Sequence, residues 1–174
     1  MARPYFAALP IAHVVLRILI PLNWFIGACI LALLLFTFIN EPWTVKALGV
    51  SGYPDPRRVM NGMRAVAAIG VIAIPLNYMI LKRLLAMVET VRAGDPFVAA
   101  NAYRLQAIAW LLLALQLLGL VIAAIARAIS TPENPVNLDA GFSIAGWLAV
   151  LLTFVLARVF AEGTLMREDL EGTV

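Results

Sequence analysis

Cysteine, histidine and charged residues are scarce in this chain, and each shortage excludes a class of protein. Among 174 residues there is one cysteine and one histidine, so the sequence supports neither an internal disulfide nor a Cys/His zinc site. Charged residues make up 13%, whereas a typical soluble domain has about 25%. The composition therefore excludes a soluble globular domain and a disordered tail.

Sequence patterns that carry catalysis are also missing. The chain has no Gly-rich phosphate loop, no His-Glu zinc helix and no Ser-x-Gly nucleophile turn. Acid–base catalysis requires titratable groups that converge on one pocket, but most of the ten carboxylates lie in predicted loops or in the tail at 162–171. We therefore predict a protein that is not an enzyme and that has no metal and no cofactor.

Apolar residues, by contrast, make up 63% of the chain. One crossing of the hydrocarbon core takes about 20 apolar residues. The predicted spans are 15–39, 65–81, 107–126 and 142–160, and they leave no room for a separate soluble domain. The sequence thus predicts a single membrane domain over residues 1–174, with an all-α fold of the integral membrane four-helix bundle type.

The distribution of the 13 Lys and Arg residues predicts the orientation of these spans. Eight of the cations flank one side and five flank the other, and the side with more cations belongs in the cytoplasm. Both termini are thus predicted to be cytoplasmic. Cations at membrane edges fit contact with anionic lipid, so membrane lipid is an expected partner and direct nucleic-acid binding is not expected.

Helix-boundary signals extend the bundle beyond the bilayer. Asp55-Pro56 and Asp95-Pro96 each combine an N-cap with proline at the first helical position, and Gly94 suits the left-handed residue after a helix end. A helix over 56–93 is about 57 Å long, whereas the hydrocarbon core is about 30 Å thick. We therefore predict a short cytoplasmic helical-hairpin extension with its tip at Gly94, beside a fourth helix that continues to about Leu170.

The two helix starts share the spacing D-P-x4-N-x2-R-x2-A, at 55–67 and again at 95–107. Common rules for starting a helix at a membrane edge explain the Asp-Pro pairs and the arginines, but they leave Asn61 and Asn101 unexplained. An old inverted duplication is the alternative, because the two helices cross the membrane in opposite directions.

Three amide side chains, Asn23, Asn77 and Gln116, form a predicted polar layer inside the membrane. Asn23 and Asn77 each follow a proline by two residues near the inner edge, so they are expected at similar depth. Amides between helices usually stabilise packing, by about 0.6–2 kcal/mol each. A ligand or ion pocket lined by kinked helices is the alternative, although no intramembrane acid or base accompanies it.

The hairpin and the tail also resemble a known family. Its loop and C-terminal signatures are similar to Gly94-Asp95-Pro96-Phe97 with Asn101, Arg104 and Leu105, and to Glu162-Gly163 with Arg167-Glu168. These are the YoaS-like bacterial membrane proteins, a family with a domain of unknown function. The likeness extends over nearly the whole chain and is weakest at 40–64. It implies a four-span protein of the bacterial inner membrane, with no catalytic residue or cofactor.

The resemblance also implies a partner, because genes of this family often lie beside one for a small helix-turn-helix regulator. The motif residues then have two readings. They fasten the hairpin to the tail, with Asp95 as a helix cap and Phe97 packed on the projecting end of the second long helix or on Phe160. Asn101 is then bonded to the fourth helix, and Arg104 lies near Glu162 or a lipid phosphate. Alternatively they form a partner-binding surface, whose candidate residues are Gly94, Asp95, Pro96, Phe97, Asn101, Arg104, Glu162, Gly163, Arg167 and Glu168.

The function we predict is a non-enzymatic membrane partner or sensor. It holds or releases the cytosolic helix-turn-helix regulator through the hairpin at 82–104 and the tail at 160–174. A small-molecule or ion transport or channel subunit that uses the polar layer is one alternative. A structural membrane protein that forms homo-oligomers through faces such as Ala65, Ala68 and Ile72 is another.

Overall fold

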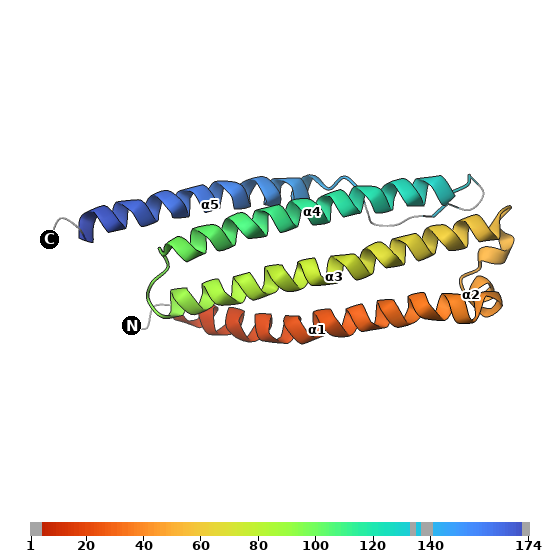
Figure 1. Ribbon diagram of the computed structural model, residues 1–174, viewed down its shortest axis with the longest axis horizontal. Helices are drawn as coiled ribbons and strands as arrows, with labels where there is room; N and C mark the ends of the chain where they lie inside the picture. Colours follow the sequence, from red (N-terminus) through yellow and green to blue (C-terminus); the bar gives the residue numbers. More distant parts are fainter. Residues whose placement is uncertain (1–4, 133–134, 137–140, 172–174) are drawn as a thin grey trace.

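The computed structural model describes residues 5–132, 135–136 and 141–171, with side chains described only within 9–167. Its elements are α1 (Tyr5–Ile39), α2 (Glu41–Ala47), the 3-10 turn η1 (Val50–Gly52), α3 (Pro56–Arg92), α4 (Ala99–Ile129) and α5 (Ile144–Glu171) (Figure 1). The described residues contain no strand, and the predicted all-α fold is confirmed.

Four of the helices are long and apolar enough to cross a membrane. The candidate spans are Leu9–Ile39, Pro56–Arg92, Ala99–Ile129 and Ile144–Arg167. A helix satisfies its backbone hydrogen bonds internally, which lipid cannot do for it, so long apolar runs favour this structure. The chain is therefore a multi-pass membrane protein.

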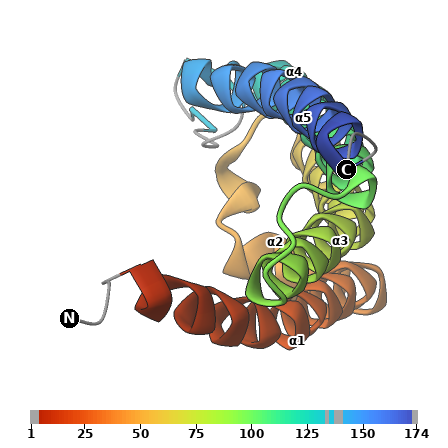
Figure 2. The same cartoon turned by 90° about the vertical axis from the view of Figure 1, so that its left-hand side faces the viewer.

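The long helices lie in an open, curved row. α1 packs on α3, α3 packs on α4, and α4 packs on α5. Seen end-on, they form a crescent with α1 and α5 at its two tips (Figure 2). Because α1 has one long neighbour, large apolar side chains such as Phe25 and Leu33 are about two-thirds exposed, at 66% and 67%. Such faces are expected where lipid is the solvent.

Glycines allow these helices to approach closely. A Cβ atom added to Gly27 of α1 would lie 2.9 Å from Cγ2 of Ile74 in α3. A Cβ atom added to Gly62 of α3 would lie 2.6 Å from Cγ2 of Ile129 in α4. Small residues are used in this way between membrane helices, where packing rather than water drives association.

The first predicted helix start is confirmed. Asp55 is the N-cap of α3, and its Oδ1 accepts a hydrogen bond from the backbone N–H of Arg58 at 3.1 Å. Pro56 is the first residue of the helix, where its missing N–H has no cost. At about 1.5 Å per residue, α3 is about 55 Å long, which exceeds a hydrocarbon core of about 30 Å.

The second predicted helix start is wrong. α4 begins at Ala99, and its N-cap, Val98, makes no side-chain capping bond. The reason is that Gly94 and Asp95 complete the end of α3. Gly94 has the expected left-handed backbone, with φ of 87°, and its N–H donates to the Val91 carbonyl. The N–H of Asp95 donates to the Thr90 carbonyl, which completes a Schellman motif.

The two ends of the molecule differ in content. The start of α1, the end of α5 and the α3–α4 turn lie together at one end, which we call the knob end (Figure 1). α2 and η1 lie at the opposite end, which we call the α2 end. α5 continues to Glu171, as predicted, so it reaches the α3–α4 turn.

Candidate functional site

The α3–α4 turn packs against the last turns of α5. The rings of Phe97 and Phe160 have centroids 5.3 Å apart, which is one of the two contacts predicted for Phe97. Gly163 leaves room for Phe97, because an added Cβ would lie 3.1 Å from the ring carbon Cδ1. The Arg167 guanidinium donates a hydrogen bond to Oδ1 of Asp95 and forms an ion pair with it. We call residues 93–98 and 160–167 the knob.

Asn101 is the buried centre that holds the turn. Its Nδ2 donates to Oγ1 of Thr90 at 2.8 Å and to the Pro96 carbonyl at 2.9 Å. Its Oδ1 accepts from Nη1 of Arg104 at 2.8 Å. The residue is 0% exposed, and a buried amide requires partners for its donors and acceptor. The prediction that Asn101 bonds the fourth helix is wrong, because the turn folds over it and supplies a nearer acceptor.

Arg104 points along α3 and not toward Glu162. Its Nη1 donates to Oδ1 of Asn101 and, at 3.5 Å, to the Ala86 carbonyl of α3. Glu162 instead accepts a hydrogen bond from Nε of Arg158, one helical turn earlier in α5, at 2.7 Å. The predicted Arg104–Glu162 contact is therefore wrong. An i,i+4 partner on the same helix is already in reach of Glu162, and Arg104 is held by α3.

The candidate residues thus divide between fastening and exposure. Asn101 is buried, and Asp95, Pro96 and Arg104 are half-buried and engaged in contacts inside the molecule. Exposed members are Gly94, Phe97, Glu162 and Arg167. Gly163 is half-buried beneath Phe97, and the side chain of Glu168 lies outside the described residues. Fastening therefore accounts for most of the motif, and only its outer part is accessible.

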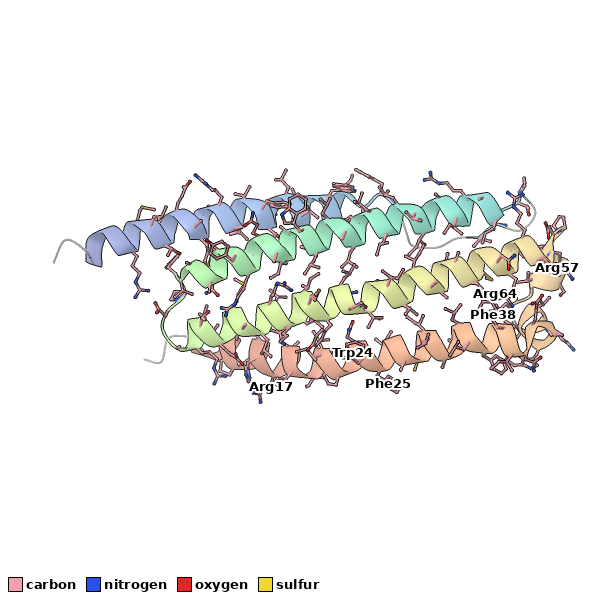
Figure 3. The ribbon with its side chains drawn as sticks, viewed as in Figure 1. Arg17, Trp24, Phe25, Phe38, Arg57 and Arg64 are labelled. Atoms are coloured by element: carbon pink, nitrogen blue, oxygen red, sulfur yellow. The ribbon has the colours of Figure 1, made fainter. Side chains whose placement is uncertain are left out.

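A second arginine cluster at the α2 end was missed at the sequence level, where Arg64 was interpreted only as a headgroup anchor. Its Nη2 donates to Oε2 of Glu41 at 3.0 Å and to the Thr37 carbonyl. Its Nε donates to Oγ1 of Thr37 at 3.1 Å. Cζ of Arg64 lies 4.3 Å from the centroid of the Phe38 ring, and Figure 3 shows the two residues side by side. The side chain is 13% exposed.

The two clusters share one arrangement. In each, an arginine near the start of a helix donates to the asparagine three residues before it, Arg64 to Asn61 and Arg104 to Asn101. In each, one member of the pair bonds a threonine that lies two residues before the last residue of the preceding long helix, Arg64 to Thr37 of α1 and Asn101 to Thr90 of α3. The repeated spacing therefore has a repeated Asn–Arg bond, whereas the threonine is bonded by the arginine in one cluster and by the asparagine in the other. The duplication stays a hypothesis.

Two members of the predicted polar layer meet and the third does not. Asn23 donates from Nδ2 to the Ile74 carbonyl of α3 at 3.1 Å. Asn77 donates to the carbonyl of Ala73 in its own helix at 3.1 Å. Both asparagines line an open, mostly apolar groove of about 210 Å³ between α1 and α3. Next to Asn23, Trp24 packs on Tyr78 with ring centroids 5.5 Å apart (Figure 3).

Gln116 lies elsewhere, between α4 and α5. Its amide occupies the space above Gly146, where a Cβ would overlap Nε2. Gln116 follows Arg104 by 12 residues, or about 18 Å. Asn77 precedes Lys82 by five residues, or about 7.5 Å. Counted from these two cations at the knob-end membrane edge, Gln116 therefore lies deeper than the Asn23–Asn77 groove, and it contributes to a different helix contact.

Comparison with known proteins gives one match. A family of proteins of unknown function, DUF2975, has a model that matches residues 37–174. The chain belongs to the DUF2975 family. No curated protein and no solved structure matches it.

The DUF2975 match covers both arginine clusters, the knob and the loop at 40–64. It begins at Thr37, so most of α1 precedes it. The expected membership of a family of unknown function is therefore confirmed, with a match that extends from the end of α1 to residue 174 and includes the loop for which the likeness was weakest.

The described part of this DUF2975 chain holds no group of three or more His, Cys, Asp or Glu side chains able to bind a metal. Cys29 is exposed on α1. Nε2 of His13 in α1 lies 3.8 Å from Oε1 of Glu89 in α3. What the arrangement offers is a two-segment knob at one end, a clamp formed by Arg64 on Thr37 and Glu41 at the other, and open grooves between the helices.

Proposed function

We propose that this chain is a non-enzymatic membrane partner or sensor that holds or releases a small cytosolic helix-turn-helix regulator at the knob. The knob end lies in the cytoplasm of a bacterium in this proposal. The excess of cations, eight against five, supports that orientation in the inner membrane.

The composition of the knob carries the proposal. Phe97 contacts Gly163 and Phe160, yet it stays 44% exposed, and Met166 is 62% exposed. Met166 follows Gly163 by three residues, so it lies on the face of α5 that Phe97 contacts. An aromatic side chain fixed by packing and partly exposed is the type of residue that anchors protein interfaces. The adjacent Asp95–Arg167 pair supplies a polar rim.

A sensor role is supported by the way the turn is fastened. Asn101 bonds α3 through Thr90 and the turn through Pro96. A shift of α4 against α3 therefore breaks hydrogen bonds that hold the turn, and Phe97 moves with it. Such a change requires a membrane-side event that favours one helix arrangement over the other.

A pull-down from membranes tests the partner. Tagged chain is solubilised with the regulator from the neighbouring gene, and the captured regulator is quantified. We expect capture by the wild type and by Trp43→Ala, an exposed aromatic at the α2 end (58%). We expect loss with Phe97→Ala plus Met166→Ala. Capture no greater than by empty membranes, or equal capture by all variants, contradicts the proposal.

Cysteine labelling tests the orientation separately. In a Cys29→Ser background, single cysteines replace exposed Arg92 and Met166 at the knob end and Lys46 at the α2 end. A membrane-impermeant maleimide applied to intact cells should label only position 46. Labelling of position 92 or 166 from outside refutes the cytoplasmic knob, even if the purified proteins bind.

A transport or channel subunit is the second candidate, and the groove lined by Asn23 and Asn77 is the observation that favours it. In that case Asn77→Leu changes solute flux into proteoliposomes, and unchanged flux counts against it. Homo-oligomers also stay a prediction. Ala65 and Ile72 of the proposed face are exposed, whereas Ala68 is half-buried.

A further inference from the structure

A groove of about 430 Å³ lies between the first half of α4 and the second half of α5. Its floor consists of small buried residues, Ala102, Ala157 and Thr164, which are 9%, 7% and 6% exposed. Larger side chains form the walls, namely Tyr103, Gln106, Phe154, Arg158 and Leu165. Because these floor residues have small side chains, a groove remains between two helices that otherwise pack against each other.

The groove lies at a membrane edge. On α4, Arg104 and Arg127 are the charged residues, and 23 positions separate them, or about 34 Å. That length is close to a hydrocarbon core of about 30 Å. On α5, Arg158 is the first charged residue after the helix begins. The groove therefore begins at apolar depth, at Phe154, passes the headgroup level at Arg158 and Tyr103, and continues beyond it to Ala99 and Leu165.

Two charged side chains lie at this edge, Arg158 on the groove wall and Glu162 beside the groove, one helical turn further along α5. The Arg158 side chain is 78% exposed, and its Nε donates to Oε1 of Glu162, which is 53% exposed, at 2.7 Å. Tyr103 is 71% exposed, and tyrosine is enriched at this level of membrane proteins. Gln106 is exposed on the groove wall, and its amide has no hydrogen-bond partner in the described part of the chain. These groups can satisfy both a phosphate and an ammonium.

We propose that this groove binds a phospholipid whose headgroup carries both a phosphate and a primary ammonium, as in phosphatidylethanolamine. The phosphate pairs with Arg158, with Tyr103 and Gln106 as further donors, and the ammonium pairs with Glu162. One acyl chain lies over the alanine floor toward Phe154.

Charge complementarity selects this headgroup over two common alternatives. A purely anionic headgroup, such as phosphatidylglycerol, places a negative charge beside Glu162 without a cation to balance it. A choline headgroup has a quaternary ammonium, which cannot donate a hydrogen bond to the carboxylate. Both are therefore expected to bind more weakly, and the proposal does not depend on a protein partner at the knob.

Native mass spectrometry of the full chain in detergent measures the preference among lipid headgroups. Phosphatidylethanolamine, phosphatidylglycerol and phosphatidylcholine with identical acyl chains are titrated, and we expect the first to bind about tenfold more tightly, which corresponds to one charge-assisted bond. Glu162→Gln should bring phosphatidylethanolamine and phosphatidylglycerol to equal affinity. Arg158→Gln should weaken all three lipids, and Arg127→Gln, at the other membrane edge, should weaken none.

Two variants that enlarge a side chain, one inside the groove and one outside it, provide an independent test. Ala99 lines the groove, whereas its exposed neighbour Ala100 does not. We expect Ala99→Leu to lower phosphatidylethanolamine binding and Ala100→Leu to leave it unchanged. Phosphatidylglycerol bound as tightly as phosphatidylethanolamine by the wild type, or equal binding by the two leucine variants, overturns the proposal. If one charge variant does not fold, the wild-type titration and the two leucine variants still decide.

Discussion

Replacing Asn101 with alanine tests whether one buried amide holds the turn that carries Phe97. The substitution removes two neutral hydrogen bonds, to Thr90 and to the Pro96 carbonyl, and one bond from the Arg104 guanidinium. Neutral bonds contribute about 1 kcal/mol each, and a bond to a charged group about 1.5–3 kcal/mol. We therefore expect Asn101→Ala to lower the free energy of unfolding by about 3–5 kcal/mol.

The repeated motif supplies a matched control. Asn61 occupies the same place in the first motif, but it is exposed and its bond with Arg64 is 3.4 Å long. Asn61→Ala should therefore cost about 0.5 kcal/mol or less. Thr90→Val removes the acceptor for Asn101 and the hydroxyl's own bond to the Met87 carbonyl, so it should fall between them, at about 1–2 kcal/mol.

Denaturant unfolding in detergent micelles, followed by tryptophan fluorescence, measures these differences. If Asn101→Ala and Asn61→Ala have unfolding free energies within about 1 kcal/mol of each other, the buried amide does not hold the turn. That result is interpretable because surface substitutions normally stay within about 0.5 kcal/mol of the wild type. If Asn101→Ala does not fold, an unfolding free energy of Thr90→Val equal to that of the wild type refutes the reasoning.

The same unfolding assay checks three further predictions. Arg64→Gln removes the ion pair between a nearly buried arginine and a half-exposed glutamate and should cost about 1.5–3 kcal/mol. Exposed Arg57→Gln should cost about 0.5 kcal/mol or less, and equal costs would contradict the clamp. Gly62→Ala pushes a Cβ into the α3–α4 contact and should cost about 1–3 kcal/mol, and Gly52→Ala, which has open space, serves as its control. Gly94→Ala meets no neighbouring atom but requires a left-handed alanine, so it should cost about 1–2 kcal/mol; an unchanged midpoint would show that the turn rearranges freely.

Features that depend on a short stretch of chain could be predicted from the sequence. An apolar run of sufficient length forms a helix in lipid whatever surrounds it, so four membrane helices follow from composition and length. The Asp55 cap and the left-handed Gly94 also depend only on adjacent residues. In the candidate site, helix lengths allowed the Phe97–Phe160 contact as one of two alternatives, because the α3–α4 turn and the end of α5 lie at the same end of the molecule.

Features that depend on how each helix is rotated against its neighbours were decided only by the tertiary structure. Arg104 bonds Asn101 and not Glu162, and Arg64 joins α1 to α3, because helix packing selects the face that each side chain presents. Asp95 was mispredicted for a related reason, since its N–H completes the end of α3 and is no longer part of a new helix start. The open crescent likewise arises from contacts between consecutive helices. Local chemistry therefore determined which segments are helices and where most of them end, whereas helix rotation and packing decided which polar groups meet.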